Sequence, residues 1–267
     1  MEIFQYSYMV KALIVGIVIA MIIPCMGVVV VNKKISIIGD ALSHVSLAGV
    51  MIGLIAGFSP IVGAIITCIL ASLLLEFIRK RFPSYQEIST AIIMSTGIGL
   101  ASILSGFVTK SANFESFLFG SIIAITPFEF YLILIVSAIV LITFLYFFRD
   151  LMYISFDEMS AKLSGVNVNR INTIFMMLIA TTISVSSRTV GILIISSLMV
   201  IPVGCALQFN LGYIKTTILS SFFGVCFMLV GLISSFYLGL KPGGSIVLCG
   251  VITLLIILIV KGKKSKN

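Results

Sequence analysis

Long apolar stretches, each close to the length of a membrane-spanning helix, dominate this chain. Of its 267 residues, 60% are hydrophobic and only 10% are charged, whereas soluble domains carry about 25% charged residues. A helix of about 20 apolar residues crosses the hydrocarbon core of a bilayer. The sequence therefore predicts an all-α, polytopic transmembrane bundle. The candidate spans are residues 9–31, 36–58, 60–78, 88–109, 127–148, 170–186, 189–207, 214–238 and 244–260.

Two parts of this assignment stay open. Only Ser187 and Arg188 separate stretches 170–186 and 189–207, so these two could instead form a re-entrant pair. The stretch 114–126 is apolar but short, and Pro127 follows it. It is interpreted as an interfacial or re-entrant helix. We therefore expect about eight or nine spans in one transmembrane domain covering residues 1–267.

The formal charge of +8 is explained by membrane topology. With the N-terminus outside and the C-terminus in the cytoplasm, the predicted spans leave four of the 17 lysines and arginines on the outer side. Those four are Lys11, Lys110, Arg188 and Lys241. This bias is the one expected for cytoplasmic loops, so no nucleic-acid partner is needed. The chain is predicted to be a multi-pass membrane protein.

Asp40 and His44 are the most informative polar residues. His44 is the only histidine, and Asp40 is the only acid in the largely apolar stretch 35–58. Residues four apart lie on the same face of a helix, one turn apart. Ionisable groups in spans usually face a bundle interior or a water-filled path. Counted from Ile35, Asp40 should lie about 8 Å into its span.

Three interpretations of this pair remain open from the residues alone. The pair could form a structural hydrogen bond between helices, belong to a proton relay, or bind a divalent transition metal. A metal shell of four or six ligands needs more than two donors. Backbone carbonyls, Ser or Thr side chains, water or a symmetry-related copy would have to supply the rest.

The longest polar loop, 149–170, contains a short predicted helix near residues 157–166. Asp157 suits the N-cap, Glu158 suits the positive end of the helix dipole, and Gly165 suits a left-handed terminating residue. The helix should lie on the cytoplasmic surface, where it could enter a groove of a soluble partner. Its apolar surface is expected to consist of Met159, Ala161 and Leu163.

Five blocks of sequence resemble a known family, the membrane permeases of bacterial ABC importers for manganese, zinc and iron. The likeness extends in the family's order from residue 39 to residue 245. The blocks are Gly39-Asp40-Ala41-Leu42-Ser43-His44 with Gly49, Glu115 to Gly120, Phe156 to Val166, Thr189 to Pro202, and Lys241-Pro242-Gly243-Gly244-Ser245. The chain departs from the family's pattern where Val45 and Ala48 replace an alanine and a proline after the histidine. Its second span should therefore be less kinked.

The resemblance implies roles for particular residues. Asp40 and His44 match the acid and histidine associated with the family's metal path. The cytoplasmic helix matches the coupling helix that receives the motion of the ATPase, and its residues are Asp157, Glu158, Ala161, Leu163 and Gly165. Implied partners are a second permease copy, a cytoplasmic ABC ATPase dimer and an extracellular metal-binding lipoprotein. The cargo would be manganese or zinc, with iron as a further candidate, and no permanently bound cofactor is expected.

The chain itself is not expected to be an enzyme. No G-x-x-x-x-G-K-[ST] phosphate loop occurs in the sequence, so ATP hydrolysis would belong to a separate subunit. The alternative function is a secondary metal-ion transporter or channel driven by a gradient. It would need further intramembrane charges for coupling, and the sequence offers few beyond Asp40 and His44.

Overall fold

The computed structural model describes residues 7–82, 85–108, 117–120, 126–187 and 190–264. Every regular element named within these ranges is helical. The elements are α1 (Ser7–Asn32), α2 (Ile38–Ala56), α3 (Pro60–Arg81), α4 (Gln86–Ser105), α6 (Pro127–Tyr146), α7 (Phe148–Phe156), α8 (Glu158–Leu163), α9 (Val168–Ser186), the 3-10 helix η2 (Ile192–Ile194), α10 (Ile195–Leu207), α11 (Tyr213–Leu238) and α12 (Pro242–Lys264).

Eight helices among the described residues are long and apolar enough to cross a membrane. The prediction of an all-α bundle is confirmed, and the eight helices agree with the expected eight or nine spans. The stretch 189–207 differs from a full span because η2 replaces the beginning of its α-helix. The 13 residues of α10 extend about 20 Å, less than the roughly 30 Å of a hydrocarbon core. Most of the stretch 114–126 lies outside the described residues.

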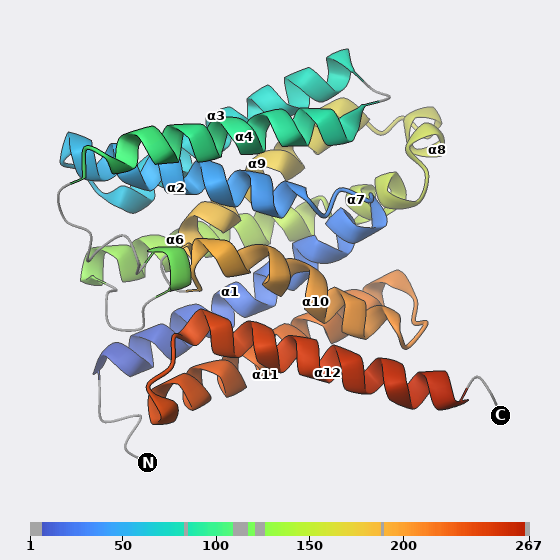
Figure 1. Cartoon of the computed structure of the whole chain (residues 1–267). Helices are drawn as coiled ribbons and strands as arrows, with labels where there is room; N and C mark the ends of the chain where they lie inside the picture. Colours follow the sequence, from blue (N-terminus) through green and yellow to red (C-terminus); the bar gives the residue numbers. More distant parts are fainter. Residues whose placement is uncertain (1–6, 83–84, 109–116, 121–125, 188–189, 265–267) are drawn as a thin grey trace.

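The long helices lie side by side, and successive helices run in opposite directions (Figure 1). Helix α1 begins at the left end of the bundle, whereas α12 ends at the right end. The right end also carries α7 and α8 and the connections after α1, α3 and α10. These are the basic connections that the sequence assigns to the cytoplasm, and that orientation stays a prediction.

Helix α2 lies at the centre of one half of the bundle, where it packs against α3, α4, α9 and α10. Small residues allow these close approaches. A Cβ atom built on Gly49 would lie 2.6 Å from the Gly63 carbonyl oxygen and 2.7 Å from the Ala64 Cα of α3. A Cβ atom on Gly97 of α4 would lie 2.7 Å from the Val45 backbone nitrogen. Glycine therefore sets the spacing of α2 from both neighbours.

Replacing Gly49 with alanine should destabilise this helix contact. The added methyl group has no space against the backbone of α3, and overpacking costs about 1–3 kcal/mol. We expect a lower melting temperature of the detergent-purified protein. The matched control is Gly99→Ala on α4, because a Cβ atom there meets nothing within 4 Å. Equal melting temperatures for the two variants would contradict the close-packing argument.

Candidate functional site

Asp40 and His44 lie near the start of α2, on one face of the helix. Asp40 is exposed in the single chain and His44 is half-buried, while the neighbouring Ile37 is 54% exposed. Most other residues of α2 are buried. The two side chains therefore lie where the rest of the chain leaves α2 uncovered.

The position of Asp40 corrects the expected depth. Helix α2 begins at Ile38, so the carboxylate belongs to the first turn, roughly 3–5 Å along the helix axis. Asp40 is the third residue of α2. This is a shallow position for a metal ligand, but a favourable one for a carboxylate. The N-terminal end of a helix carries a partial positive charge that stabilises an anion.

Neither the Asp40 carboxylate nor the His44 imidazole forms a hydrogen bond or an ion pair within the described ranges. The interpretation as a structural hydrogen bond between helices therefore has no partner group there. The same ranges contain no cluster of three or more His, Cys, Asp or Glu residues able to hold a metal. The pair thus offers one oxygen ligand and one nitrogen ligand, and a complete shell needs other donors.

Two buried hydroxyl groups lie on or against the first turns of α2. Ser43 Oγ on α2 and Ser196 Oγ on α10 are both buried without a hydrogen-bond partner among the described residues. Ser196 Oγ approaches α2 at Gly39, where a Cβ atom would lie only 2.8 Å away. Buried hydroxyls without partners are rare and commonly mark a place for water or an ion. The sequence did not single these serines out, because serine is common in membrane helices.

Further along the same face, α2 is sealed by apolar residues. Positions 40, 44, 47 and 51 follow the spacing of one helix face, and Leu47 and Met51 are buried. They belong to an apolar cluster, here called the Phe117 cluster, that comprises Leu47, Ala48, Val50, Met51, Ala64, Ala101, Phe117 and Ile192. Phe117 comes from the segment preceding α6, and Ile192 comes from η2. The polar end of the face is thus open, and the apolar end is closed.

The predicted cytoplasmic helix is present as α8, and its termini have the expected geometry. The Asp157 carboxylate accepts a hydrogen bond from the Met159 backbone N–H at 2.9 Å and one from the Ser160 hydroxyl at 2.5 Å. These donors lower the pKa of Asp157 below its usual value, with the Ser160 hydroxyl as the largest cause. The carboxylate therefore remains ionised as a cap at neutral pH.

The C-terminal end of α8 forms a Schellman motif. Gly165 has a φ of +86°, its N–H donates to the Lys162 carbonyl, and the Val166 N–H donates to the Ala161 carbonyl. Only glycine adopts this left-handed backbone without strain. Gly165 therefore has the left-handed terminating conformation that the sequence predicts.

One part of the predicted apolar surface of α8 is wrong. Met159 is 67% exposed and Leu163 is 83% exposed, but Ala161 is 1% exposed. Successive residues of a helix differ by about 100°, so Ala161 and Leu163 point in nearly opposite directions. Ala161 therefore anchors α8 to the bundle, whereas Met159 and Leu163, four residues apart, form its free apolar face.

Comparison with known proteins agrees with this arrangement. A family model described as the ABC 3 transport family matches residues 5–261. A "Probable metal transport system membrane protein" of Treponema pallidum is 33% identical over 95% of this chain and 96% of that protein. The manganese transport system membrane protein MntC of Listeria monocytogenes is 29% identical over 93% of this chain and 89% of that protein.

A solved structure is also similar over its whole length. It is described as PsaBC from Streptococcus pneumoniae in complex with Fab, and the alignment has a TM-score of 0.88 at 28% identity. It covers 99% of this chain and 97% of the other chain. Similarity of this extent applies to the whole helical bundle, including α2 and α8.

Proposed function

Because the chain belongs to the ABC 3 transport family, a family of membrane subunits of ABC transporters, we propose that it carries manganese or zinc into the cell, with iron as a further candidate. The chain is a non-catalytic, multi-pass membrane permease. The choice of metals follows its relatives, which include the manganese transport system membrane protein MntC and the high-affinity zinc uptake system membrane protein ZnuB of Haemophilus influenzae.

The uncovered face of α2 carries this proposal. The Asp40 carboxylate and the His44 imidazole lie there without partners, and the buried Ser43 and Ser196 hydroxyls belong to the same end of α2. Oxygen and nitrogen donors of this kind suit manganese, zinc and ferrous iron alike. A metal held by few ligands is released readily, as a transport site requires. His44 would bind the ion through an imidazole nitrogen.

The Phe117 cluster would act as the outer closure of the path. It follows Asp40 and His44 along the same face of α2, towards the end of the bundle assigned to the outside. Apolar side chains without polar partners exclude a hydrated ion. The described conformation would therefore be open to the cytoplasm and closed to the exterior, and ATP binding would reverse this arrangement.

Three partners complete the proposed importer. A second copy of this chain would cover the exposed Asp40 side of α2 and supply the missing ligands. A cytoplasmic ABC ATPase dimer would bind the Met159 and Leu163 face of α8. A metal-binding lipoprotein would deliver the ion to the outer mouth at loops 110–126 and 239–243. In the described part of these loops, Lys241 Nζ lies 4.2 Å from the centroid of the Phe119 ring, so the two loops contact each other.

Reconstituted uptake tests this function. The chain, co-purified with the ATPase and placed in proteoliposomes with the binding protein, should accumulate radioactive manganese or zinc only when ATP is supplied. A variant ATPase unable to hydrolyse ATP is the control. Accumulation driven by a proton or sodium gradient without nucleotide would instead support the secondary transporter. Metal content of cells lacking the gene would then identify the cargo.

A further inference from the structure

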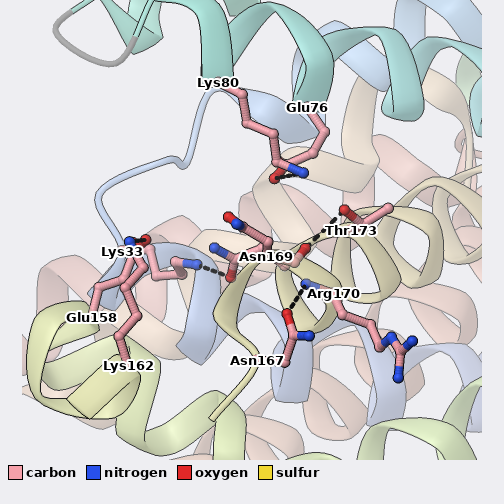
Figure 2. Close-up of polar contacts among 10 residues, drawn as sticks. Lys33, Glu76, Lys80, Glu158, Lys162, Asn167, Asn169, Arg170 and Thr173 are labelled. Carbon is pink, nitrogen blue, oxygen red and sulfur yellow. Dashed lines mark hydrogen bonds and ion pairs between the residues drawn. The ribbon is translucent and has the colours of Figure 1, made fainter. Parts of the chain in front are cut away.

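A polar cavity lies between α3 and α8, at the end of the bundle that carries the C-terminal end of α12 (Figures 1 and 2). Its volume is about 460 Å³, within the range of about 300–1,000 Å³ found for ligand pockets. Figure 2 shows that charged side chains from three segments point into this space. The charged lining residues are Lys33, Glu76, Arg79, Lys80, Glu158 and Lys162. The cavity is separate from the Asp40 and His44 pair.

The charges that line the cavity do not balance. Glu76 pairs with Lys80 at 3.6 Å, and Glu158 pairs with Lys162 at 3.4 Å. Both carboxylates are therefore matched by a lysine of their own helix. Lys33 and Arg79 are left over, so the lining has four cations and two anions.

The two unmatched cations have little compensation from the protein. Lys33 Nζ donates a hydrogen bond of 2.7 Å to Asn172 Oδ1, a neutral acceptor. Arg79 Nε is buried and has no hydrogen-bond partner among the described residues. Burial lowers the pKa of Lys33, the Glu158 and Glu76 carboxylates raise it, and the Arg79 charge lowers it. An anion placed between the two cations would relieve both the burial and the repulsion.

A phosphate group fits this arrangement. A guanidinium presents its N–H donors as a planar fork that matches phosphate oxygens, and an ammonium is a common phosphate partner. Two unmatched positive charges suit the charge of a phosphodiester or a phosphomonoester. A divalent cation would be repelled by the net positive lining.

The outer surface of α3 indicates where this phosphate comes from. A stripe of exposed apolar residues leads along α3 to the cavity at the spacing of one helix face, and it consists of Ile66, Leu70, Leu73 and Phe77. Lys80 continues the stripe by three residues. The stripe lies on the side of α3 opposite its buried residues Ile61, Cys68 and Leu75, so it faces away from the bundle. It offers an apolar surface about 17 Å long for an acyl chain.

We propose that the cavity binds the phosphate headgroup of an anionic phospholipid, with an acyl chain lying along the exposed stripe of α3. Basic cavities at the cytoplasmic ends of membrane helices commonly bind such headgroups. Because Glu158 and Lys162 of α8 form one wall, a bound lipid would join α8 to α3. The anionic lipid content of the membrane would then influence how firmly the coupling helix is held.

Lipid retention tests this site without any transport measurement, so it is independent of the proposed cargo. The permease–ATPase complex is placed in nanodiscs of phosphatidylcholine with added phosphatidylglycerol, extracted into detergent, and examined by native mass spectrometry. The double variant Lys33→Gln/Arg79→Gln should bind phosphatidylglycerol roughly 30-fold more weakly than the unaltered protein. This figure assumes that each removed cation contributes as much to binding as one Lys or Arg near an anionic membrane surface.

The matched control is Lys34→Gln/Arg81→Gln, which removes the same charge from neighbouring residues that do not line the cavity. This control should retain the lipid. Equal losses in both double variants would overturn the site, because general surface attraction would then explain binding. A second check uses only the unaltered complex. Its melting temperature should rise when phosphatidylglycerol is added and should not rise with phosphatidylcholine. No rise with phosphatidylglycerol would also overturn the site.

Two further outcomes would assign the cavity to another ligand. Glycerol phosphate added to phosphatidylcholine nanodiscs should not reproduce the melting shift; if it does, a free phosphate and not a lipid is the ligand. If the Lys33→Gln/Arg79→Gln variant loses the ATPase and keeps phosphatidylglycerol, the cavity is a protein-docking surface. Either result would overturn the lipid proposal.

Discussion

Replacing His44 with glutamine, or Asp40 with asparagine, is expected to reduce ATP-driven metal uptake about 100-fold or more, since even residues that only orient a metal ligand contribute about 10–100-fold to metal affinity. Each substitution keeps roughly the size of the side chain. Asp40→Asn removes the negative charge of the oxygen ligand, and His44→Gln removes the imidazole nitrogen. The measurement is the initial rate of manganese or zinc accumulation in proteoliposomes.

Two controls distinguish a metal ligand from a structural residue. Neither side chain has a hydrogen-bond partner among the described residues, so both variants should keep the melting temperature and the ATPase binding of the unaltered protein. Asp150→Asn removes a carboxylate from α7 instead of from α2, and should leave uptake unchanged. Full uptake by both the His44 and the Asp40 variant would remove these residues from the metal path.

Replacing Leu163 with serine is expected to uncouple the permease from its ATPase. The Leu163 side chain is 83% exposed in the single chain, and burying a leucine in a partner's groove contributes about 1.5–3 kcal/mol. Its loss should therefore weaken ATPase binding about 10–100-fold. Size-exclusion chromatography and surface plasmon resonance measure the association, and transport should fall with it.

The control for this prediction is Leu211→Ser, which lies in the connection between α10 and α11 at the same end of the bundle and is 41% exposed. It removes an exposed leucine from outside α8. If both variants bind the ATPase equally well, the assignment of α8 as the coupling helix is wrong. If both lose it equally, the docking surface extends beyond α8.

The sequence predicted the membrane helices well because their signal is local. Apolar length determines whether a segment can cross a bilayer, and eight of the expected spans appear as long helices. Capping signals are equally local, which explains the correct placement of Asp157 and Gly165 at the ends of α8. The stretch 189–207 was harder, because its apolar composition does not reveal where η2 interrupts the helix.

Errors arose where the direction of a side chain mattered. Ala161 was expected on the free surface of α8 together with Leu163, yet it is buried. Glu76 and Lys80 pair across one helix turn, and no spacing in the sequence places them at the wall of a cavity. The same limit applies to Phe117, whose burial against Leu47 and Met51 joins segments distant in sequence.

The sequence by itself determined that this protein is an all-helical membrane bundle, that Asp40 and His44 share one helix face, and that a capped helix interrupts the longest polar loop. Each of these follows from residue type and spacing along one segment. Only the tertiary structure decided which face of α2 remains open, what closes its far end, and that Lys33 and Arg79 line one cavity. Those features depend on contacts between helices far apart in the chain, and no local pattern encodes such contacts.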